Sequence, residues 1–520
     1  MNAMHLARWP RSAGWLIGTL VLSTCTLALA APPSGIPERP DQLQFPPLQY
    51  APPEAAQYRV NLAGGIPAYL AEDPTVPLVN VTVLLRIGPD LDPSGKEGLA
   101  ETAVHLLTRS GTATMTAEQL EERLSFLGAE LESGLGGGGG MMGFGRVPIG
   151  DSEARVTLNL LSKDIDAGLA LLVDCLKQAG FQEDRLALRR DQEIQNMKRR
   201  NDESARIEQM EWGFLMYGPD HWSNRYATES SMKSIAREDL VAFQRRYVGP
   251  KNFVLAVSGD FEKRAMAKKL ERAFAKWPTP GERPGPPAAP AASSSPGWFI
   301  ADKDVNQTRV ILGLRTIDRY DPDFYAAQVM NYILGGGGFT SRLVNRIRSD
   351  EGLAYTVRSS FDNGTYYAEP WRAFFQTKAR STAYALQIAL TEIGRVRDER
   401  VTESELETAK NALVEGFPAR FPTAGAIAGV LAAEELTGRY AKDPKYLARF
   451  TSHVAEVTAE DVQRVARRLL DPAQMTVLMV GNATEMALPD GKHPVTLGEL
   501  AGGDPQRLPA RDPLTMKPVP

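Results

Sequence analysis

Five histidines limit the metal chemistry open to this chain. They are His5, His105, His221, His453 and His493. A zinc-peptidase helix carries two histidines about four residues apart on one face. No two of these histidines lie within one helical turn, so no such motif exists in either direction along the chain. The pair that most resembles such a motif combines a carboxylate with an imidazole: Glu101 lies four residues before His105, on the same face of an expected helix.

Length and charge narrow the classes of function. The chain has 520 residues, enough for two or more domains, since domains usually hold about 100–200 residues. Its 59 Lys and Arg face 63 Asp and Glu, so no basic excess can neutralise nucleic-acid phosphates, and we expect no nucleic-acid partner. A hydrophobic content of 43% excludes a disordered chain, and two cysteines exclude a disulfide scaffold.

The N-terminal segment has the pattern of a secretory signal. Arg8 and Arg11 form a positive start, an apolar run follows over 15–30, and Ala28-Leu29-Ala30 is a small-x-small cleavage site. The pattern predicts a signal peptide at 1–30, a periplasmic or secreted protein, and no membrane span after cleavage.

The two cysteines have different surroundings in the sequence. Cys25 follows Leu22-Ser23-Thr24, a faint match to a lipoprotein cleavage box in which threonine fits poorly before the cysteine. Cys175 lies in an apolar run typical of a buried helix. We therefore predict that Cys175 is the single thiol of the processed chain and that it is buried and unreactive.

Hydrophobic patterning predicts an α+β fold. Apolar and β-branched runs predict strands at 77–85, 154–161, 308–314 and 366–377. Helical spacing of apolar residues predicts helices at 98–108, 116–127, 165–179, 182–205, 323–334 and 381–396. Strands mixed with helices in both halves indicate two α+β domains.

Two stretches without periodicity set the domain boundaries. Residues 31–55 read as a Pro-rich N-terminal arm, and residues 278–296, dense in Pro, Ala and Ser, read as a linker. The predicted domains are therefore 56–277 and 297–487, with a C-terminal tail at 488–520.

The two halves also repeat each other. The segment Ile235 to Gly259 lies without gaps on Val457 to Gly481, with matching Glu-Asp, Arg-Arg, Pro and Gly positions. Each copy predicts a helix with an acidic first turn, a break at proline, and a buried strand that ends in glycine. This order at the end of both halves indicates a duplication.

Several blocks resemble the pitrilysin-type M16 (M16B-like) metallopeptidase family, over residues 58–481. They include GLAETAVHLLTRSGT, LMYGPDHWSNRYATESSMKSIAREDL and LGGGGFTSRLVNRIRSDEGLAYTV. The resemblance implies two tandem homologous domains like those of mitochondrial processing peptidase, each a β-sheet packed with helices. It also implies descent from zinc-dependent metalloendopeptidases.

The same resemblance locates a degenerate zinc site. Family members hold zinc with a His-x-x-Glu-His helix and a glutamate from a later helix. The aligned positions are Glu101, Val104 and His105, and Glu193 matches the third ligand. Because a glutamate replaces the first histidine, we expect no cofactor in this chain, and valine could not accept a proton from metal-bound water even if a metal were present. Two alternatives stay open: Glu101, His105 and Glu193 could still hold a metal, or His105 is a hydrogen-bonded helix histidine near the core and Glu193 a solvated or ion-paired side chain.

A second family feature is retained. An arginine and a tyrosine seven residues apart map onto Arg348 and Tyr355. In the family this pair faces the zinc site, where a guanidinium binds substrate carbonyl groups and a phenol donates to the oxyanion of the transition state. The other interpretation is a surface arginine and a buried tyrosine that serve only the fold.

A degenerate zinc site together with a retained Arg/Tyr pair predicts a non-catalytic subunit. Some bacterial family members are split into two chains, of which one carries the zinc motif and the other the Arg/Tyr pair. We therefore expect a heterodimeric periplasmic peptidase in which a zinc-bearing M16 partner receives Arg348 and Tyr355 in trans, and whose substrates are peptides or unfolded polypeptides. The alternatives are a structural core-type or peptide-binding scaffold without proteolytic role, and a self-sufficient metallopeptidase that uses Glu101, His105 and Glu193.

A glycine-rich run follows the expected active-site helices, at Gly134 to Gly145. In active relatives this region forms a sheet edge that pairs with substrate. Because glycine loses the most backbone entropy on ordering and has no side chain to pack, we expect a mobile loop instead of a substrate-binding strand.

Overall fold

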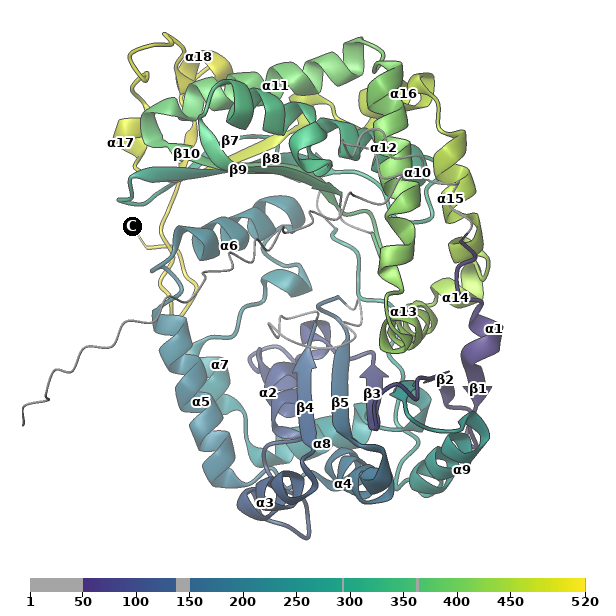
Figure 1. Ribbon diagram of the computed structural model, residues 1–520. Helices are drawn as coiled ribbons and strands as arrows, with labels where there is room; N and C mark the ends of the chain where they lie inside the picture. Colours follow the sequence, from purple (N-terminus) through teal and green to yellow (C-terminus); the bar gives the residue numbers. More distant parts are fainter. Residues whose placement is uncertain (1–49, 137–149, 292–293, 362–363, 520) are drawn as a thin grey trace, which may run out of the picture. The chain divides into compact units, whose positions relative to one another are not determined.

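The computed structural model describes residues 50–136, 150–291, 294–361 and 364–519 (Figure 1). This part of the chain contains two six-stranded sheets with helices packed on them, which confirms the predicted α+β class. The predicted signal peptide and most of the Pro-rich arm lie outside the described residues. None of the helices in the described ranges is both long and apolar enough to cross a bilayer.

Each half of the chain builds one sheet. The first sheet has the order β1 (Arg59–Asn61), β2 (Pro67–Glu72), β6 (Phe253–Gly259), β3 (Leu78–Leu85), β5 (Ala154–Leu161), β4 (Glu130–Leu135). The second has the order β12 (Gln506–Leu508), β7 (Gly297–Asp302), β11 (Thr476–Gly481), β8 (Gln307–Arg315), β10 (Pro370–Lys378), β9 (Ala354–Phe361).

Helices follow and connect these strands. In the first half they are α1 (Ala55–Tyr58), α2 (Leu99–Leu106), α3 (Ala117–Leu127), α4 (Ile165–Gln178), α5 (Glu183–Lys198), α6 (Ser204–Tyr217), α7 (Glu229–Ser234), α8 (Arg237–Tyr247) and α9 (Lys263–Phe274). In the second half they are α10 (Phe324–Asn331), α11 (Thr382–Asp398), α12 (Glu403–Glu415), α13 (Ala424–Leu436), α14 (Arg439–Lys442), α15 (Tyr446–Glu456), α16 (Ala459–Leu469), α17 (Ala483–Met486) and α18 (Leu497–Ala501).

The predicted duplication is confirmed in three dimensions. The repeated segments form α8 followed by β6 and α16 followed by β11. In each sheet the repeated strand is parallel to one neighbour, β2 or β7, and antiparallel to the other, β3 or β8. The copies differ at the outer strand, because β1 precedes β2 and pairs antiparallel, whereas β12 comes from the C-terminus and pairs parallel to β7.

The central strands of both sheets are buried on both faces. Along β6, Phe253, Leu255 and Val257 contact the core beneath the helices of the first half, and the intervening Val254 and Ala256 contact a second cluster. Strands β8 and β11 alternate in the same way between two clusters. Successive strand side chains point to opposite faces, so near-continuous apolar runs are what a sheet covered on both sides requires.

Two helices cover the sheet of the other half (Figure 1). Helix α6 places Trp212, Leu215 and Met216 on the second sheet. Helix α13, rich in alanine, packs residues such as Leu431 and Ala432 on the first sheet. Each sheet is thus covered on its second face by a helix from the other half. Neither half by itself would bury both faces of its sheet.

One predicted helix is interrupted. The range 182–205 was expected to be continuous, but α5 ends at Lys198 and α6 begins at Ser204. The turn between them is held by the C-terminal segment, since the Arg200 guanidinium donates to the carbonyls of Ala227 (2.7 Å) and Pro513 (3.0 Å). The expectation of one continuous helix was wrong: α5 stops at Lys198, and the turn that follows is joined to a residue more than three hundred positions away.

Residues 488–519, expected to be a tail, pack on both halves. Strand β12 extends the second sheet, and Arg511 forms an ion pair at 2.7 Å with the buried Glu211 on α6 of the first half. Residues 278–291, the described start of the expected linker, form neither helix nor strand.

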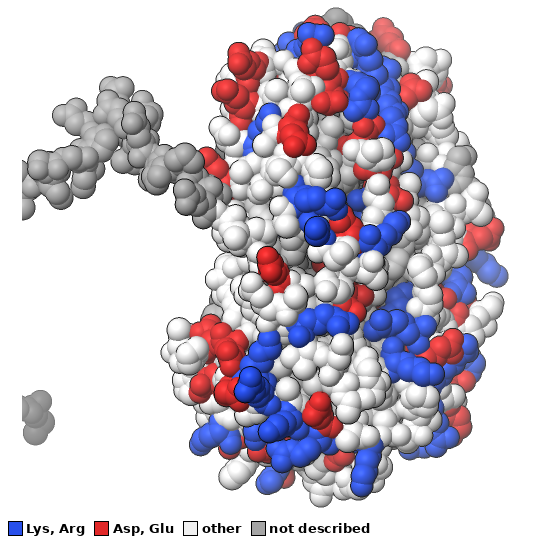
Figure 2. Space-filling view, turned by 90° about the vertical axis from the view of Figure 1, so that its right-hand side faces the viewer, with Lys and Arg blue, Asp and Glu red and all other residues white. Residues whose placement is uncertain are grey.

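Charged side chains of both signs are interspersed over the face shown in Figure 2. Lys and Arg form small groups that Asp and Glu interrupt.

Cys175 is a free, fully buried thiol on α4, as the sequence predicts. Burial raises its pKa to about 12, with a smaller contribution from the neighbouring Asp174 carboxylate. Because the thiolate is the reactive form, we expect the folded chain without residues 1–30 to show no reaction with a disulfide reagent at pH 8. Denaturant should expose one thiol; a native chain that reacts at the rate of free cysteine would contradict this prediction.

Candidate functional site

Helix α2 positions three of the four degenerate zinc-site residues, Glu101, Val104 and His105. Its start is held by the buried Asp92 carboxylate, which accepts from the backbone N–H of Gly98 (2.8 Å) and of Ala100 (2.7 Å). Gly98 has φ 98°, a left-handed conformation that favours glycine at this turn. The Asp92 carboxylate thus satisfies backbone N–H groups at the N-terminus of α2 and fixes where the helix begins.

The far end of α2 is attached to the edge strand β4. Ser133 donates through Oγ to the Val104 carbonyl at 2.6 Å, and Arg109 donates to the carbonyls of His105 (3.2 Å) and Ser133 (3.3 Å). The Val104 side chain itself is 1% exposed and belongs to the core of the first half. The position that carries the general base in the family is thus filled by an aliphatic core side chain, which cannot take up a proton.

An arginine joins the two carboxylates of the degenerate site. Arg189 on α5 contacts Glu101 (Nη2 to Oε1, 2.9 Å) and, one helical turn along α5, Glu193 (Nη1 to Oε1, 2.7 Å). The Arg189 side chain is 13% exposed and that of Glu193 is 19% exposed. The guanidinium supplies the positive charge that a metal would otherwise supply to these oxygens. The interpretation of Glu193 as an ion-paired side chain is confirmed.

His105 stands apart from this ion-paired group. Burial and, to a smaller extent, the nearby charges of Arg189 and Arg109 together lower its pKa to about 3, so its imidazole is neutral at ordinary pH. No hydrogen bond links its ring to another residue in the described ranges, which corrects the expectation of a hydrogen-bonded core histidine. The same two arginines raise the free energy of placing a divalent cation beside this ring.

These residues do not fit a zinc ion. Within the part of the chain that the structure describes, no three His, Cys, Asp or Glu side chains are placed to hold a metal. One oxygen of each carboxylate, Oε1 of Glu101 and Oε1 of Glu193, is bound to Arg189. Sequence analysis missed Arg189, although its position four residues before Glu193 could have suggested an ion pair.

Arg348 and Tyr355 lie together in the second half. Arg348 is in the π-helical segment Val344–Asp350, and Tyr355 is the second residue of β9. The Arg348 Cζ atom lies 4.5 Å from the ring centroid of Tyr355 and 4.5 Å from that of Phe339. The guanidinium is therefore held between two aromatic rings, a favourable cation–π geometry.

This aromatic pair, Phe339 and Tyr355, is exposed, at 64% and 81%. The Arg348 guanidinium forms no hydrogen bond or ion pair with other residues in the described ranges, so its N–H donors are available to an incoming group. The interpretation of Tyr355 as a buried structural residue is wrong. Phe339 was missed by sequence analysis, because its place beside Arg348 depends on the turn that brings Gly338–Thr340 over the π-helical segment.

The glycine-rich run begins inside the sheet. Gly134 and Leu135 belong to β4, the last strand in the order of the first sheet, and pair with Arg155 and Ala154 of β5. The expectation of a loop from Gly134 onward is therefore wrong for these two residues. The remainder of the predicted mobile loop, from residue 137, lies outside the described residues.

Comparison with known proteins identifies the type of domain. Residues 234–413 match the family model described as Peptidase M16 inactive domain. Over this stretch the chain is similar to a peptidase M16 inactive domain. This match spans the end of the first half and the beginning of the second, and it includes Arg348 and Tyr355.

The M16 similarity extends over most of the chain. An uncharacterized zinc protease of Mycobacterium leprae is 24% identical over 438 residues, which cover 83% of this chain and 93% of that protein. The crystal structure of a peptidase M16 inactive domain from Pseudomonas fluorescens superposes with a TM-score of 0.69 at 23% identity and covers 82% of this chain and 98% of its own.

A third comparison concerns a longer protein. The periplasmic protease PqqL of Escherichia coli superposes with a TM-score of 0.65 at 13% identity, over 82% of this chain and 45% of that one. At these identities the solved structures show a shared fold. The chain is thus an M16 homologue of the inactive-domain type, in which the zinc positions hold an ion-paired arginine.

Proposed function

We propose that this M16 homologue is the non-catalytic subunit of a heterodimeric periplasmic M16 zinc peptidase. It supplies Arg348 and Tyr355 to a partner that carries an intact zinc motif. The observation that carries the proposal is the contrast between its two halves. Arg189 neutralises the degenerate zinc site of the first half, while Arg348 of the second half keeps its donors unpaired beside an exposed phenol.

The geometry around Arg348 supports binding of a polar substrate group. A guanidinium between two rings is fixed in orientation, so little entropy is lost when its N–H groups bind a carbonyl or carboxylate. The Tyr355 hydroxyl is at the exposed end of the same cluster and can donate to an oxyanion. Exposed aromatic side chains grouped at one place on a surface are also typical of interaction sites.

The substrates in this proposal are peptides or unfolded polypeptides, and the zinc belongs to the partner. The location in the periplasm rests on the signal pattern at 1–30, with its Arg8 and Arg11 start and its Ala28-Leu29-Ala30 cleavage site.

Reconstitution tests the proposal. We expect each purified chain alone to leave a quenched fluorescent peptide intact, and a co-expressed pair with a zinc-motif M16 chain from the same genome to cleave it. Cleavage should stop on addition of a chelator and return with zinc, because the metal is the partner's. A matched control is the pair in which the partner's motif glutamate is replaced by glutamine. Cleavage by this chain alone at a rate comparable to that of the pair would refute the subunit role.

The scaffold alternative makes a different prediction for the same assay. A protein that only binds peptides or only supports an assembly would leave the partner's activity independent of Arg348 and Tyr355. A partner chain that is fully active without this chain would favour the scaffold.

A further inference from the structure

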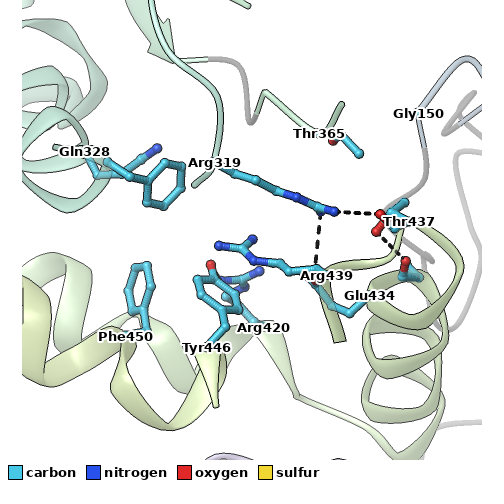
Figure 3. Close-up of a pocket in the computed structure, with 12 residues that line it drawn as sticks. Gly150, Arg319, Gln328, Thr365, Arg420, Glu434, Thr437, Arg439, Tyr446 and Phe450 are labelled. Carbon is cyan, nitrogen blue, oxygen red and sulfur yellow. Dashed lines mark hydrogen bonds and ion pairs between the residues drawn. The ribbon is translucent and has the colours of Figure 1, made fainter. Parts of the chain in front are cut away.

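A cavity of about 300 Å³ in the second half is lined by three arginines and one glutamate (Figure 3). Arg319 comes from the loop between β8 and α10, Arg420 from the turn before α13, and Arg439 from the first residue of α14. Glu434, near the end of α13, is the single carboxylate in the described lining. Positive charge therefore exceeds negative charge around this cavity.

Two of these arginines are buried with unused donors. Arg319 and Arg439 are each 6% exposed. The Nε atoms of both, and Oε2 of Glu434, have no hydrogen-bond partner among the described residues. The Glu434 oxygen lies 3.8 Å from Arg319 Nη1 and 3.7 Å from Arg439 Nε, beyond hydrogen-bond distance. Buried polar groups are nearly always hydrogen-bonded, so the two Nε donors indicate an acceptor group that completes them.

Surrounding contacts hold both guanidinium groups in place. Arg319 donates through Nη2 to the Thr437 carbonyl at 3.0 Å and to the Tyr320 hydroxyl at 3.2 Å. Arg439 stacks on Tyr446, with its Cζ atom 3.2 Å from the ring centroid. A guanidinium that lies flat on an aromatic ring keeps its in-plane N–H donors for another partner. The site is thus ordered before any ligand enters.

We propose that this cavity binds a small oxyanion, a phosphate or a carboxylate group, between Arg319 and Arg439. Two guanidinium groups offer the planar, multiple donors that oxyanions accept. Arg420 lies at the open side of the cavity, where it donates to the Tyr446 hydroxyl at 3.2 Å and adds a third positive charge. Glu434 limits the affinity, because its carboxylate competes with the ligand for the same two arginines.

Calorimetric titration of the purified chain with inorganic phosphate and with citrate tests the site, at constant ionic strength with chloride as the reference anion. We expect saturable binding of at least one of the two. Arg439→Gln should weaken it about tenfold or more, the loss typical of one charge-assisted contact. Arg449→Gln is the matched control, because this exposed arginine on α15 pairs with Asp443 outside the cavity and should leave the affinity within about twofold.

Glu434→Gln supplies the second readout. Removing a negative charge beside the ligand should tighten binding about threefold or more, a direction that a purely structural residue would not produce. Circular dichroism shows whether Arg439→Gln still folds. If it does not, the affinity of Glu434→Gln alone tests the proposed site. Saturation by phosphate alone or by citrate alone assigns the ligand class. Binding of neither anion, or Glu434→Gln binding no tighter than the parent chain, would overturn the proposal.

Discussion

Tyr355→Phe should lower the peptidase turnover of the reconstituted pair by about 10²–10³-fold, the usual effect of removing one donor to a transition-state oxyanion. The substitution keeps the ring on which Arg348 rests, 4.5 Å from the guanidinium, and removes only the hydroxyl. Substrate affinity should therefore change little while kcat falls. Initial rates over a range of peptide concentrations give the two constants separately.

Two further variants separate binding from positioning at the same place. Arg348→Ala should lower kcat/KM by a similar factor, because the free guanidinium donors are lost. Phe339→Ala should cost only about two- to fivefold, since an exposed cation–π contact is worth roughly 0.5–1 kcal/mol.

Arg346→Ala is the matched control for these variants. This arginine lies on the same π-helical segment but pairs with Asp350 at 2.7 Å. Size-exclusion chromatography must show that every variant still assembles with its partner. Unchanged turnover in assembled Tyr355→Phe and Arg348→Ala pairs would remove the claim that this chain completes the partner's site.

The second large effect concerns zinc uptake. Glu101→His alone should not create a zinc site, whereas Glu101→His combined with Arg189→Ala should bind zinc at least about 10²-fold more tightly. The reason is charge: like unit charges about 4 Å apart near a protein surface repel by about 4 kcal/mol, and Arg189 also keeps Glu193 engaged. Once Arg189 is removed, the introduced imidazole, His105 and Glu193 are free to act as three ligands.

Competition with a chromogenic chelator measures this affinity. The control is Glu101→His with Arg185→Ala, which removes an arginine one turn earlier on α5 that pairs with Glu118 and Glu121 instead. Neither variant should hydrolyse peptides, because Val104 remains in place. Equal zinc affinity with and without Arg189 would show that the arginine is not what excludes the metal.

Periodicity and repetition predicted much of the fold. The α+β class, the duplicated helix–break–strand unit and the buried Cys175 depend on local hydrophobic patterns, which the chain shows without reference to distant parts. Predictions failed where distant segments decide the outcome. The end of α5 depends on Arg200 bonding to residues near the C-terminus, and β12 joins the second sheet from beyond the predicted domain boundary.

In the candidate site, too, the sequence determined some features and the tertiary structure determined others. Residue types alone established that no second histidine lies within one helical turn of His105 and that Val104 stands where a base is needed, because a missing chemical group is missing in any fold. Only the tertiary structure decided what fills these positions: Arg189 between two carboxylates, and Arg348 between the rings of Phe339 and Tyr355. Ion pairs and ring contacts form between side chains that separate elements bring within a few ångströms, and that proximity comes from packing, not from the order of residues along the chain.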